Sequence, residues 1–498
     1  MTSSSSIAAR ALLAVVLMIG FYLLALVIAG GLLYIPYADV VYAHRIHFKL
    51  ALGCLIPALA ILWSVLPRRD KFEAPGPRLT REQQPRLFAD LESVAGSVGQ
   101  AMPAEVYLVP DVNAWVSQRG GIMGMGSRRV MGLGLSLMRV LTRSQFRAVL
   151  AHEFGHYHGG DTKLGPWVYK TRGAIGRTLQ SLAGAKGEGS ILQMPFLWYG
   201  KMFLRITHAV SRRQEFQADE VAARAVGAKP LIDGLRTVHG AGFAFQAYWA
   251  NECAPVLNAG FHPPLVEGFQ RFVGAKPIAE VVAKQLDEEM KEGKVDPYDT
   301  HPPLKERIAA VAGLPAGEVA AEDPPATSLL AEVPALENEL LAVMAGAEQA
   351  GKLKLIAWDD VCAQVYLPQW AKLLKANTTA LRGITPESLP TLAADQSALG
   401  KRFVQISGEK AEDKEAEGLA TAVIGSALAL LLVNRGGKPD TAPGNTISVS
   451  LNSRQIEPYG VLKALAGGEL SAEEWGRTCA DLGVAGVDFG KADAQAGG

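Results

Sequence analysis

The sequence predicts a mainly α-helical protein of the α+β class, with an N-terminal transmembrane helical hairpin, a central domain that holds a small sheet, and a mostly helical C-terminal extension. Two long apolar runs precede residue 70. Strand-like segments gather between residues 104 and 134, whereas apolar residues recur at helical spacing through most of the remaining chain. These observations divide the chain into an anchor at residues 1–70, a central domain at 71–315 and an extension at 316–498.

The N-terminal hairpin rests on two apolar segments. Ala11 to Tyr37 is 27 residues long and carries no charge; as a helix it would measure about 40 Å, enough to cross a bilayer. It is also too long for the apolar part of a signal peptide, so we expect an uncleaved anchor. The second segment, Leu50 to Leu66, has 17 residues. This is near the lower limit for a span, and a buried core helix is its alternative.

Lysine and arginine near these segments predict their orientation. Five basic residues follow the second segment within a short distance, whereas the connecting loop holds only Arg45 and Lys49. Because basic residues are enriched on the cytoplasmic side, we expect an integral protein of the cell membrane with two spans and its C-terminal part in the cytoplasm. The bias is modest, and the inverted topology stays open. The five residues are Arg68, Arg69, Lys71, Arg78 and Arg81.

Composition excludes two other classes of protein. Lysine plus arginine equals aspartate plus glutamate at 49 each, so no basic excess indicates a nucleic-acid partner. The four cysteines are widely separated and form no CxxC pair, which argues against a disulfide framework and against a cysteine zinc site.

The central domain reads as a helix, three short strands and then helices. We expect a helix at 86–100, strands at 104–111, 113–118 and 128–134, and a glycine-rich hairpin turn between the last two. A further helix begins at Thr142 or Ser144 and stops at Gly159-Gly160.

Farther along the chain, residues 195–227 form one long helix or two. The early part of this segment touches either the membrane surface or, as we prefer, the protein core. Residues 315–328 are rich in alanine, glutamate and proline and predict a linker. The apolar piece from Leu419 to Val433 is short for a span and predicts a core helix.

The segment AHEFGHYHGGD, at 151–161, contains the arrangement HExxH. On a helix, His152 and His156 project from one face one turn apart and can share a tetrahedral metal. Glu153 lies beside the first ligand, where it can take a proton from a water molecule without binding the metal itself. The pentapeptide alone is informative but needs a third ligand.

The best candidate for the third ligand is Glu215 in SRRQEFQADEVAARAVG. Glu215 and Asp219 lie one turn apart on a helix face that otherwise suits burial, and buried carboxylates need a partner such as a metal with its histidines. The alternative is a solvated helix on which Arg212 pairs with Glu215. His158 and Asp161 are poorer candidates, because one points to the opposite side of the helix and the other follows the glycine pair.

The set AHEFGH, SRRQEFQAD and THPPLKERI resembles the HtpX-like membrane zinc metallopeptidases, the family that also includes the CAAX prenyl endopeptidases. The resemblance covers roughly residues 75–315 and the preceding hairpin. It implies a zincin-type protease domain of the gluzincin kind, with a small edge-strand sheet. It also implies one zinc per chain, bound by His152, His156 and Glu215, with Glu153 as general base.

The resemblance assigns further residues. Asp219 would orient a ligand histidine, and Asn113-Ala114 would belong to an edge strand on which an extended substrate pairs. His301 would come near the site and stabilise the oxyanion; its alternative is a place in a helix N-terminal cap. The chain departs from the family in two ways: residues 162–210 contain no clean span, and the extension has no counterpart that we can place.

The function predicted from these features is that of a membrane-anchored zinc metalloendopeptidase, which cleaves membrane or misfolded proteins in protein quality control. Its partners are protein or peptide substrates and the lipid bilayer. One alternative is a narrow processing protease for one membrane-tethered or lipidated partner. The other is a non-catalytic membrane scaffold that acts through the C-terminal extension.

Overall fold

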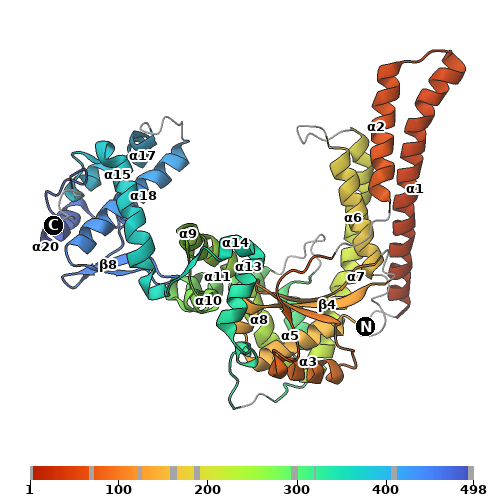
Figure 1. Cartoon of the computed structure of the whole chain (residues 1–498), viewed down its shortest axis with the longest axis horizontal. Coiled ribbons are helices and arrows are strands. Elements are labelled where there is room, and N and C mark those ends of the chain that lie inside the picture. The colour runs from red at the N-terminus through yellow and green to blue at the C-terminus, as the bar shows by residue number, and fades with distance from the viewer. Residues whose placement is uncertain are drawn as a thin grey trace. The chain divides into compact units, whose positions relative to one another are not determined.

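The fold was analysed in a computed structural model of the chain, shown in Figure 1. It describes residues 4–66, 72–121, 126–157, 165–183, 191–292, 301–318, 321–404 and 412–491. Helices dominate and the sheets are small, so the predicted mainly helical α+β class is confirmed. The chain forms two compact units: residues 1–242 with 284–346, and residues 243–283 with 347–498. These units are defined by contacts within the chain, whereas the predicted boundaries at residues 70 and 315 separate parts with different expected roles. The predicted division stays a prediction.

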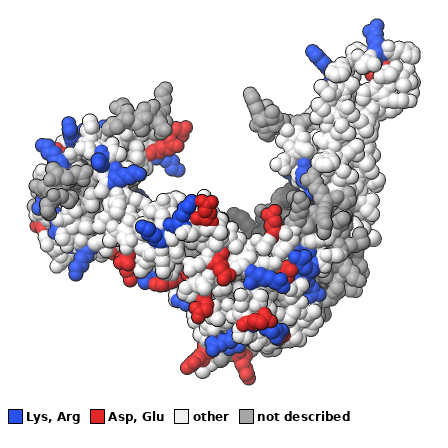
Figure 2. Space-filling model, in the orientation of Figure 1, with Lys and Arg blue, Asp and Glu red and all other residues white. Residues whose placement is uncertain are grey.

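The predicted apolar hairpin consists of helices α1 (Ser4–Ala43) and α2 (Phe48–Val65). Both helices are long and apolar enough to cross a membrane. The surface of the hairpin in Figure 2 is largely free of charged side chains between its loop and its base.

Two later helices pack beside this hairpin, α6 (Gly165–Ser181) and α7 (Met194–Val226) (Figure 1). Phe21 of α1, Ile61 of α2 and Phe196 of α7 are fully buried in their shared core. Tyr199 also donates a hydrogen bond of 2.6 Å to the Leu17 carbonyl. Residues 195–226 of the predicted segment form one helix, which ends before Gly227, and one face of its early part packs against the protein core as preferred.

The opposite face of the early part of α7 is exposed and largely apolar, and the charged Lys201 and Arg205 also lie exposed on it. Trp198 is 73% exposed, and Met194, Leu197 and Met202 are also exposed on this side. Since the same helix buries Phe196 and Phe203 against the hairpin, α7 carries apolar side chains on two faces in this region. Such a helix does not match a surface that faces only water.

The sheet of the first unit has four strands in the order β1-β2-β4-β3. Strands β2 and β4 are parallel, and β3 pairs with β4 in an antiparallel register that sets Ala114 opposite Leu133. Strand β3 lies at the end of this order, so it is an edge strand. The three predicted strands are present, β1 is additional, and the predicted turn falls partly on residues 122–125, outside the described residues. The bounds are Arg78–Leu79, Glu105–Val109, Ala114–Arg119 and Arg128–Gly134 for β1 to β4.

Helices α3 (Pro85–Ser97), α4 (Leu135–Val140) and α5 (Arg143–Gly155) surround this sheet. Thr142 caps α5, as predicted, because its side chain accepts a hydrogen bond from the Gln145 amide while the Gln145 side-chain oxygen accepts one from the Thr142 amide. The described helix ends at Gly155, earlier than the predicted stop at Gly159-Gly160, which lies outside the described residues.

Part of the predicted linker at 315–328 is not a linker. The Asp323 carboxylate accepts a hydrogen bond of 2.9 Å from the Ser144 amide in the first turn of α5. Pro325 forms a β-bridge with Thr142, and a short 3-10 helix follows at Ala326–Leu329. A negative charge at a helix N-terminus is stabilising, which explains why this polar segment packs onto α5.

The first unit is completed by helices α12 (Leu304–Val311) and α13 (Val333–Ala345). Helices α8 (Ala228–Tyr248) and α11 (Lys276–Glu292) contribute residues to both units.

The second unit is built around α18 (Asp413–Asn434), which contains the predicted core helix. This helix is long and apolar enough for a span, but its Val423, Ile424 and Leu428 are fully buried among side chains of the unit. Its other helices are α9 (Ala254–Asn258) and α10 (Leu265–Gly274), which precede the predicted extension, and six helices within the extension, which confirm that it is mostly helical: α14 (Ala347–Ala350), α15 (Leu367–Leu381), α16 (Leu389–Ala393), α17 (Gln396–Val404), α19 (Val461–Gly467) and α20 (Ala472–Asp481). Its strands are β5 (Phe261–His262), β6 (Lys354–Leu355), β7 (Lys438–Asp440), β8 (Ser448–Leu451) and β9 (Arg454–Ile456).

Candidate metal centre

A close approach of two helices builds the site. Helix α5 packs against α7 at Gly155, where a Cβ atom would lie only 3.0 Å from the Ala218 Cα. The two small residues let the helix axes come close together, and the side chains one turn away on either helix then face each other. Ala218 is fully buried in this contact.

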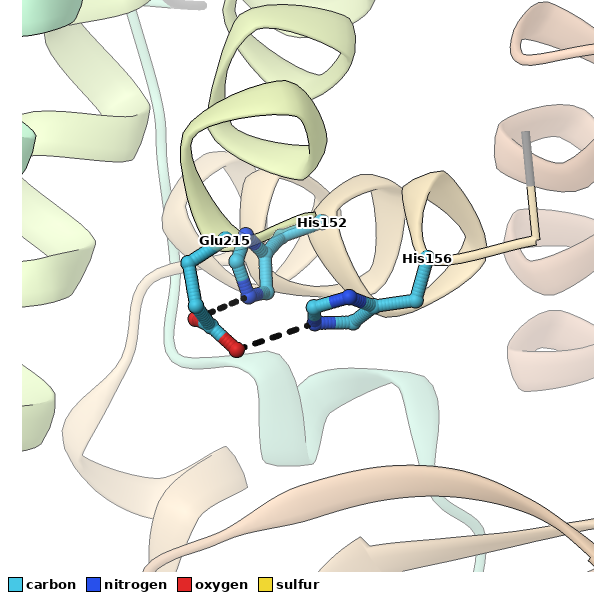
Figure 3. A group of neighbouring side chains, drawn as sticks. All are labelled: His152, His156 and Glu215. Atoms are coloured by element: carbon cyan, nitrogen blue, oxygen red, sulfur yellow. Dashed lines mark ion pairs between the residues drawn. The ribbon is translucent and has the colours of Figure 1, made fainter. Parts of the chain in front are cut away.

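His152 and His156 of α5 and Glu215 of α7 point toward one another (Figure 3). His152 Nε2 lies 3.4 Å from Glu215 Oε2, and His156 Nε2 lies 3.5 Å from Glu215 Oε1. One ligand atom from each residue lies within 4.8 Å of the others. The structure thus brings Glu215 against two histidines that lie about sixty positions earlier in the sequence.

These three residues fit a zinc ion. Ligands about 2.0–2.1 Å from zinc in a tetrahedral site lie about 3.4 Å from one another, close to the two separations observed. The Glu215 Oε2 atom is buried and makes no hydrogen bond of good geometry with the described residues, although ring nitrogens of His301 and His152 lie 3.1 and 3.4 Å from it. A buried carboxylate oxygen without a hydrogen bond is costly unless a cation binds it. The alternative of a solvated Glu215 does not hold, because the residue is 5% exposed.

Asp219 and Arg307 support the first histidine. His152 Nδ1 lies 2.9 Å from Asp219 Oδ1. Arg307, on α12, donates two hydrogen bonds to the same carboxylate, of 2.8 Å from Nε and 2.7 Å from Nη2. Asp219 is fully buried and Arg307 is 5% exposed. The Arg307 guanidinium therefore holds the Asp219 carboxylate in place, and this carboxylate orients the His152 ring so that Nε2 faces the site.

Arg307 is a site residue that the sequence reasoning missed. It lies within the quoted THPPLKERI segment, six residues after His301. A single arginine on a short helix is ordinarily a surface residue. Only its contact with Asp219, 88 positions earlier in the chain, identifies it as part of the centre.

The neighbouring charges shift the pKa values of the site. Burial lowers the pKa of His152, but the Asp219 and Glu215 carboxylates outweigh it and raise the value to about 9. Burial and the charge on His152 lower the pKa of His156 to about 4. Burial favours protonation of Glu215, yet the contacts with His152 and His301 hold its pKa below the usual range. Without a metal, His152 is therefore the protonated member of the three at neutral pH.

Glu153 lies beside the three residues in a different environment. Its pKa is raised to about 7, mainly by burial; the positive charge of His152 opposes this shift and the negative charge of Glu215 adds to it. A carboxylate whose pKa lies near neutrality can both accept and return a proton at physiological pH. This property matches the predicted role of Glu153, which itself stays a prediction.

A cavity of about 260 Å³ adjoins the site. Asn113 and Ala114, at the start of β3, line it together with His152, Glu153 and His301. His301 is turned toward the ligand carboxylate, with Nδ1 3.1 Å from Glu215 Oε2. The structure thus places every predicted site residue around one centre. Helix α8 supplies much of the remaining wall, with the apolar Leu231, Leu235 and Val238, and the wall also includes His239 and Arg307.

The outlying candidates for the metal site, His158 and Asp161, lie outside the described residues. Among the described residues, the only group of three histidine, cysteine or acidic side chains close enough to hold a metal ion is His152, His156 and Glu215.

Comparison with known proteins finds peptidase relatives for the central part of the chain, which contains the site. The family model described as peptidase family M48 matches residues 81–314. The chain is 26% identical over 251 residues to "Protease HtpX" of Vibrio cholerae serotype O1 (strain M66-2), which covers 46% of this chain and 72% of the relative. It is 26% identical over 248 residues to "Protease HtpX" of Stenotrophomonas maltophilia (strain K279a), which covers 45% and 71%. No solved structure matches.

Proposed function

We propose that this chain, which the model of peptidase family M48 matches over residues 81–314, is a membrane-anchored, zinc-dependent endopeptidase of that family. The observation that carries the proposal is the convergence of His152, His156 and Glu215 within 4.8 Å. Glu153 and the start of edge strand β3 line the cavity beside them.

His152, His156 and Glu215 are the residues that would hold the zinc ion. When bound, zinc supplies a Lewis acid that polarises a peptide carbonyl and lowers the pKa of water toward about 7. Asp219 and Arg307 hold His152 in the orientation that directs Nε2 toward the other two ligands.

Glu153 moves the proton. Its carboxylate takes a proton from the attacking water at one oxygen and returns it to the nitrogen of the departing amine. The pKa of about 7 that burial gives Glu153 suits both halves of this transfer. His301, at the mouth of the same cavity, would donate a hydrogen bond to the carbonyl oxygen as negative charge develops on it.

The edge strand indicates the form of the substrate. An extended peptide can add to β3 through backbone hydrogen bonds, with Asn113 and Ala114 nearest the catalytic groups. This mode requires a segment without secondary structure of its own, which favours unfolded stretches of membrane or misfolded proteins. The two N-terminal spans would hold the enzyme at the cell membrane, and the basic residues after the second span favour a domain that faces the cytoplasm.

The test is zinc content, by elemental analysis of the full chain in detergent, together with casein cleavage by the native protein and by Glu153→Gln. We expect one zinc per chain in both proteins and cleavage by the native protein alone. Zinc in both without cleavage by either would contradict a general endopeptidase and favour a narrow processing protease. No zinc in either protein would overturn the assignment of the site.

A further inference from the structure

The hydrogen bonds of β3 show which of its residues face the free edge of the sheet. The Asn113 carbonyl accepts a hydrogen bond of 2.8 Å from the Gly134 amide, so the backbone of Asn113 faces strand β4. Successive backbone groups along a strand alternate between its two sides. The backbone N–H and C=O groups of Ala114 and Val116 therefore face away from β4, toward the position that a pairing peptide would take.

The outward-facing carbonyl of Val116 already accepts a hydrogen bond from a side chain of the protein. The Tyr157 hydroxyl donates a hydrogen bond of 3.0 Å to the Val116 carbonyl. Tyr157 directly follows His156, the C-cap of α5, and its amide donates a hydrogen bond of 3.0 Å to the Phe154 carbonyl in the last turn of that helix. The guanidinium carbon of Arg129, on β4, lies 4.7 Å from the centre of the tyrosine ring and holds the ring from a second side.

The position of the Tyr157 hydroxyl prevents a peptide that pairs with β3 at Ala114 from continuing its pairing to Val116. Neighbouring strands lie about 4.8 Å apart, and a pairing N–H nitrogen lies about 2.9 Å from the carbonyl oxygen that it reaches. The Tyr157 oxygen lies at the same distance from the Val116 carbonyl. It thus takes the place of the peptide nitrogen that would pair there. Ala114 lines the catalytic cavity, and no side chain of the described residues makes a hydrogen bond to its outward-facing backbone groups.

We propose that Tyr157 is a specificity-determining residue that ends substrate pairing along β3 at Ala114. The inference rests on the proposed function and defines the class of its substrates: extended segments that pair with the enzyme over a short length beside the cleaved bond. Residues farther out on that side leave the sheet and add no backbone hydrogen bonds. The affected side is N-terminal if the substrate runs antiparallel to β3 and C-terminal if it runs parallel.

The experiment measures peptide binding in the Glu153→Gln background, in which a bound peptide stays intact. The probes are a fluorescent hexapeptide from a casein cleavage site and two versions extended by four residues, one at each end. Fluorescence anisotropy gives their dissociation constants for the parent and for added Tyr157→Ala and Tyr157→Phe. Tyr199→Phe is the matched control, since it removes a comparable hydroxyl-to-backbone hydrogen bond far along α7. Zinc content checks that each variant keeps its fold.

In the parent and in the Tyr199 control, we expect the three peptides to bind within about twofold of one another. In Tyr157→Ala, one extended peptide should bind about tenfold more tightly than the hexapeptide, because two further backbone hydrogen bonds form. Tyr157→Phe should shift the same way by about threefold. A parent that already gains affinity with length, or variants that gain none, would overturn the inference alone. Failure of all peptides to bind any of the proteins would overturn the proposed function with it.

Discussion

Replacement of Gly155 by alanine should weaken metal binding by separating the two helices that carry the ligands. The new Cβ would lie 3.0 Å from the Ala218 Cα, 3.2 Å from its carbonyl oxygen and 3.3 Å from its Cβ. Ordinary van der Waals contact between such atoms begins at about 3.5 Å. Helices α5 and α7 must therefore move apart by a few tenths of an ångström at a point one residue from His156.

The magnitude follows from the tolerance of the site. Metal–ligand distances in working sites stay within about 0.2 Å of their ordinary values, so the shift exceeds what the ligands can absorb without cost. Overpacking of a buried contact costs about 1–3 kcal/mol. If that cost falls on the metal-bound state, at about 1.4 kcal/mol per tenfold, zinc affinity should drop roughly 5- to 150-fold.

The assay is a zinc titration of the detergent-solubilised protein against a chelator of known affinity, with casein cleavage measured in parallel. The control is Gly96→Ala in α3, where no atom lies within 4 Å of the new Cβ. A glycine-to-alanine change inside a helix ordinarily stabilises it by about 0.5–1 kcal/mol, so the control should keep its zinc affinity. If Gly155→Ala bound zinc as tightly as the native chain, the contact at Ala218 would not be what sets the spacing of the ligands.

Three further predictions concern the supporting residues and the membrane. As the pH increases toward about 9, zinc affinity should rise by about tenfold per pH unit, because zinc must displace the proton that the two carboxylates hold on His152. Chelator competition at several pH values measures this affinity, and an affinity independent of pH would contradict the prediction. Asp219→Asn should lower zinc affinity by about 10- to 100-fold and destabilise the fold by about 3–5 kcal/mol, since it removes the nearer of the two carboxylates that pair with the buried Arg307. Denaturant unfolding of the metal-free protein measures the second effect, and Glu220→Gln, at an exposed pair on the same helix, should show neither effect. In vesicles of brominated lipid, Trp198→Phe should remove part of the tryptophan quenching and Trp358→Phe, at a buried residue, should remove none; equal quenching in both variants would mean that the exposed face of α7 does not touch lipid.

Local patterns in the sequence were sufficient for much of this protein. An uncharged run of 27 residues can only be buried or placed in a membrane, so the hairpin was predictable from composition. The spacing of His152 and His156 puts both rings on one face of a helix whatever surrounds it. The three strands and the capped start of α5 likewise depend on neighbours within a few residues.

Contacts between distant segments were not predictable in this way. Arg307 is an ordinary surface-type residue in the sequence and becomes part of the site only because α12 brings it against a fully buried Asp219. The segment at 323–329 has the composition of a linker, yet the Asp323 carboxylate accepts a hydrogen bond from the Ser144 amide, which has no partner within the first turn of α5. Tyr157 reaches Val116 across 41 positions. The residues that could bind a metal were therefore predictable, since ligand chemistry and helical spacing are local. The residues that hold those ligands in place, and the part of β3 that stays open, were not predictable, because a side chain's partners depend on the packing of helices that the local sequence does not encode.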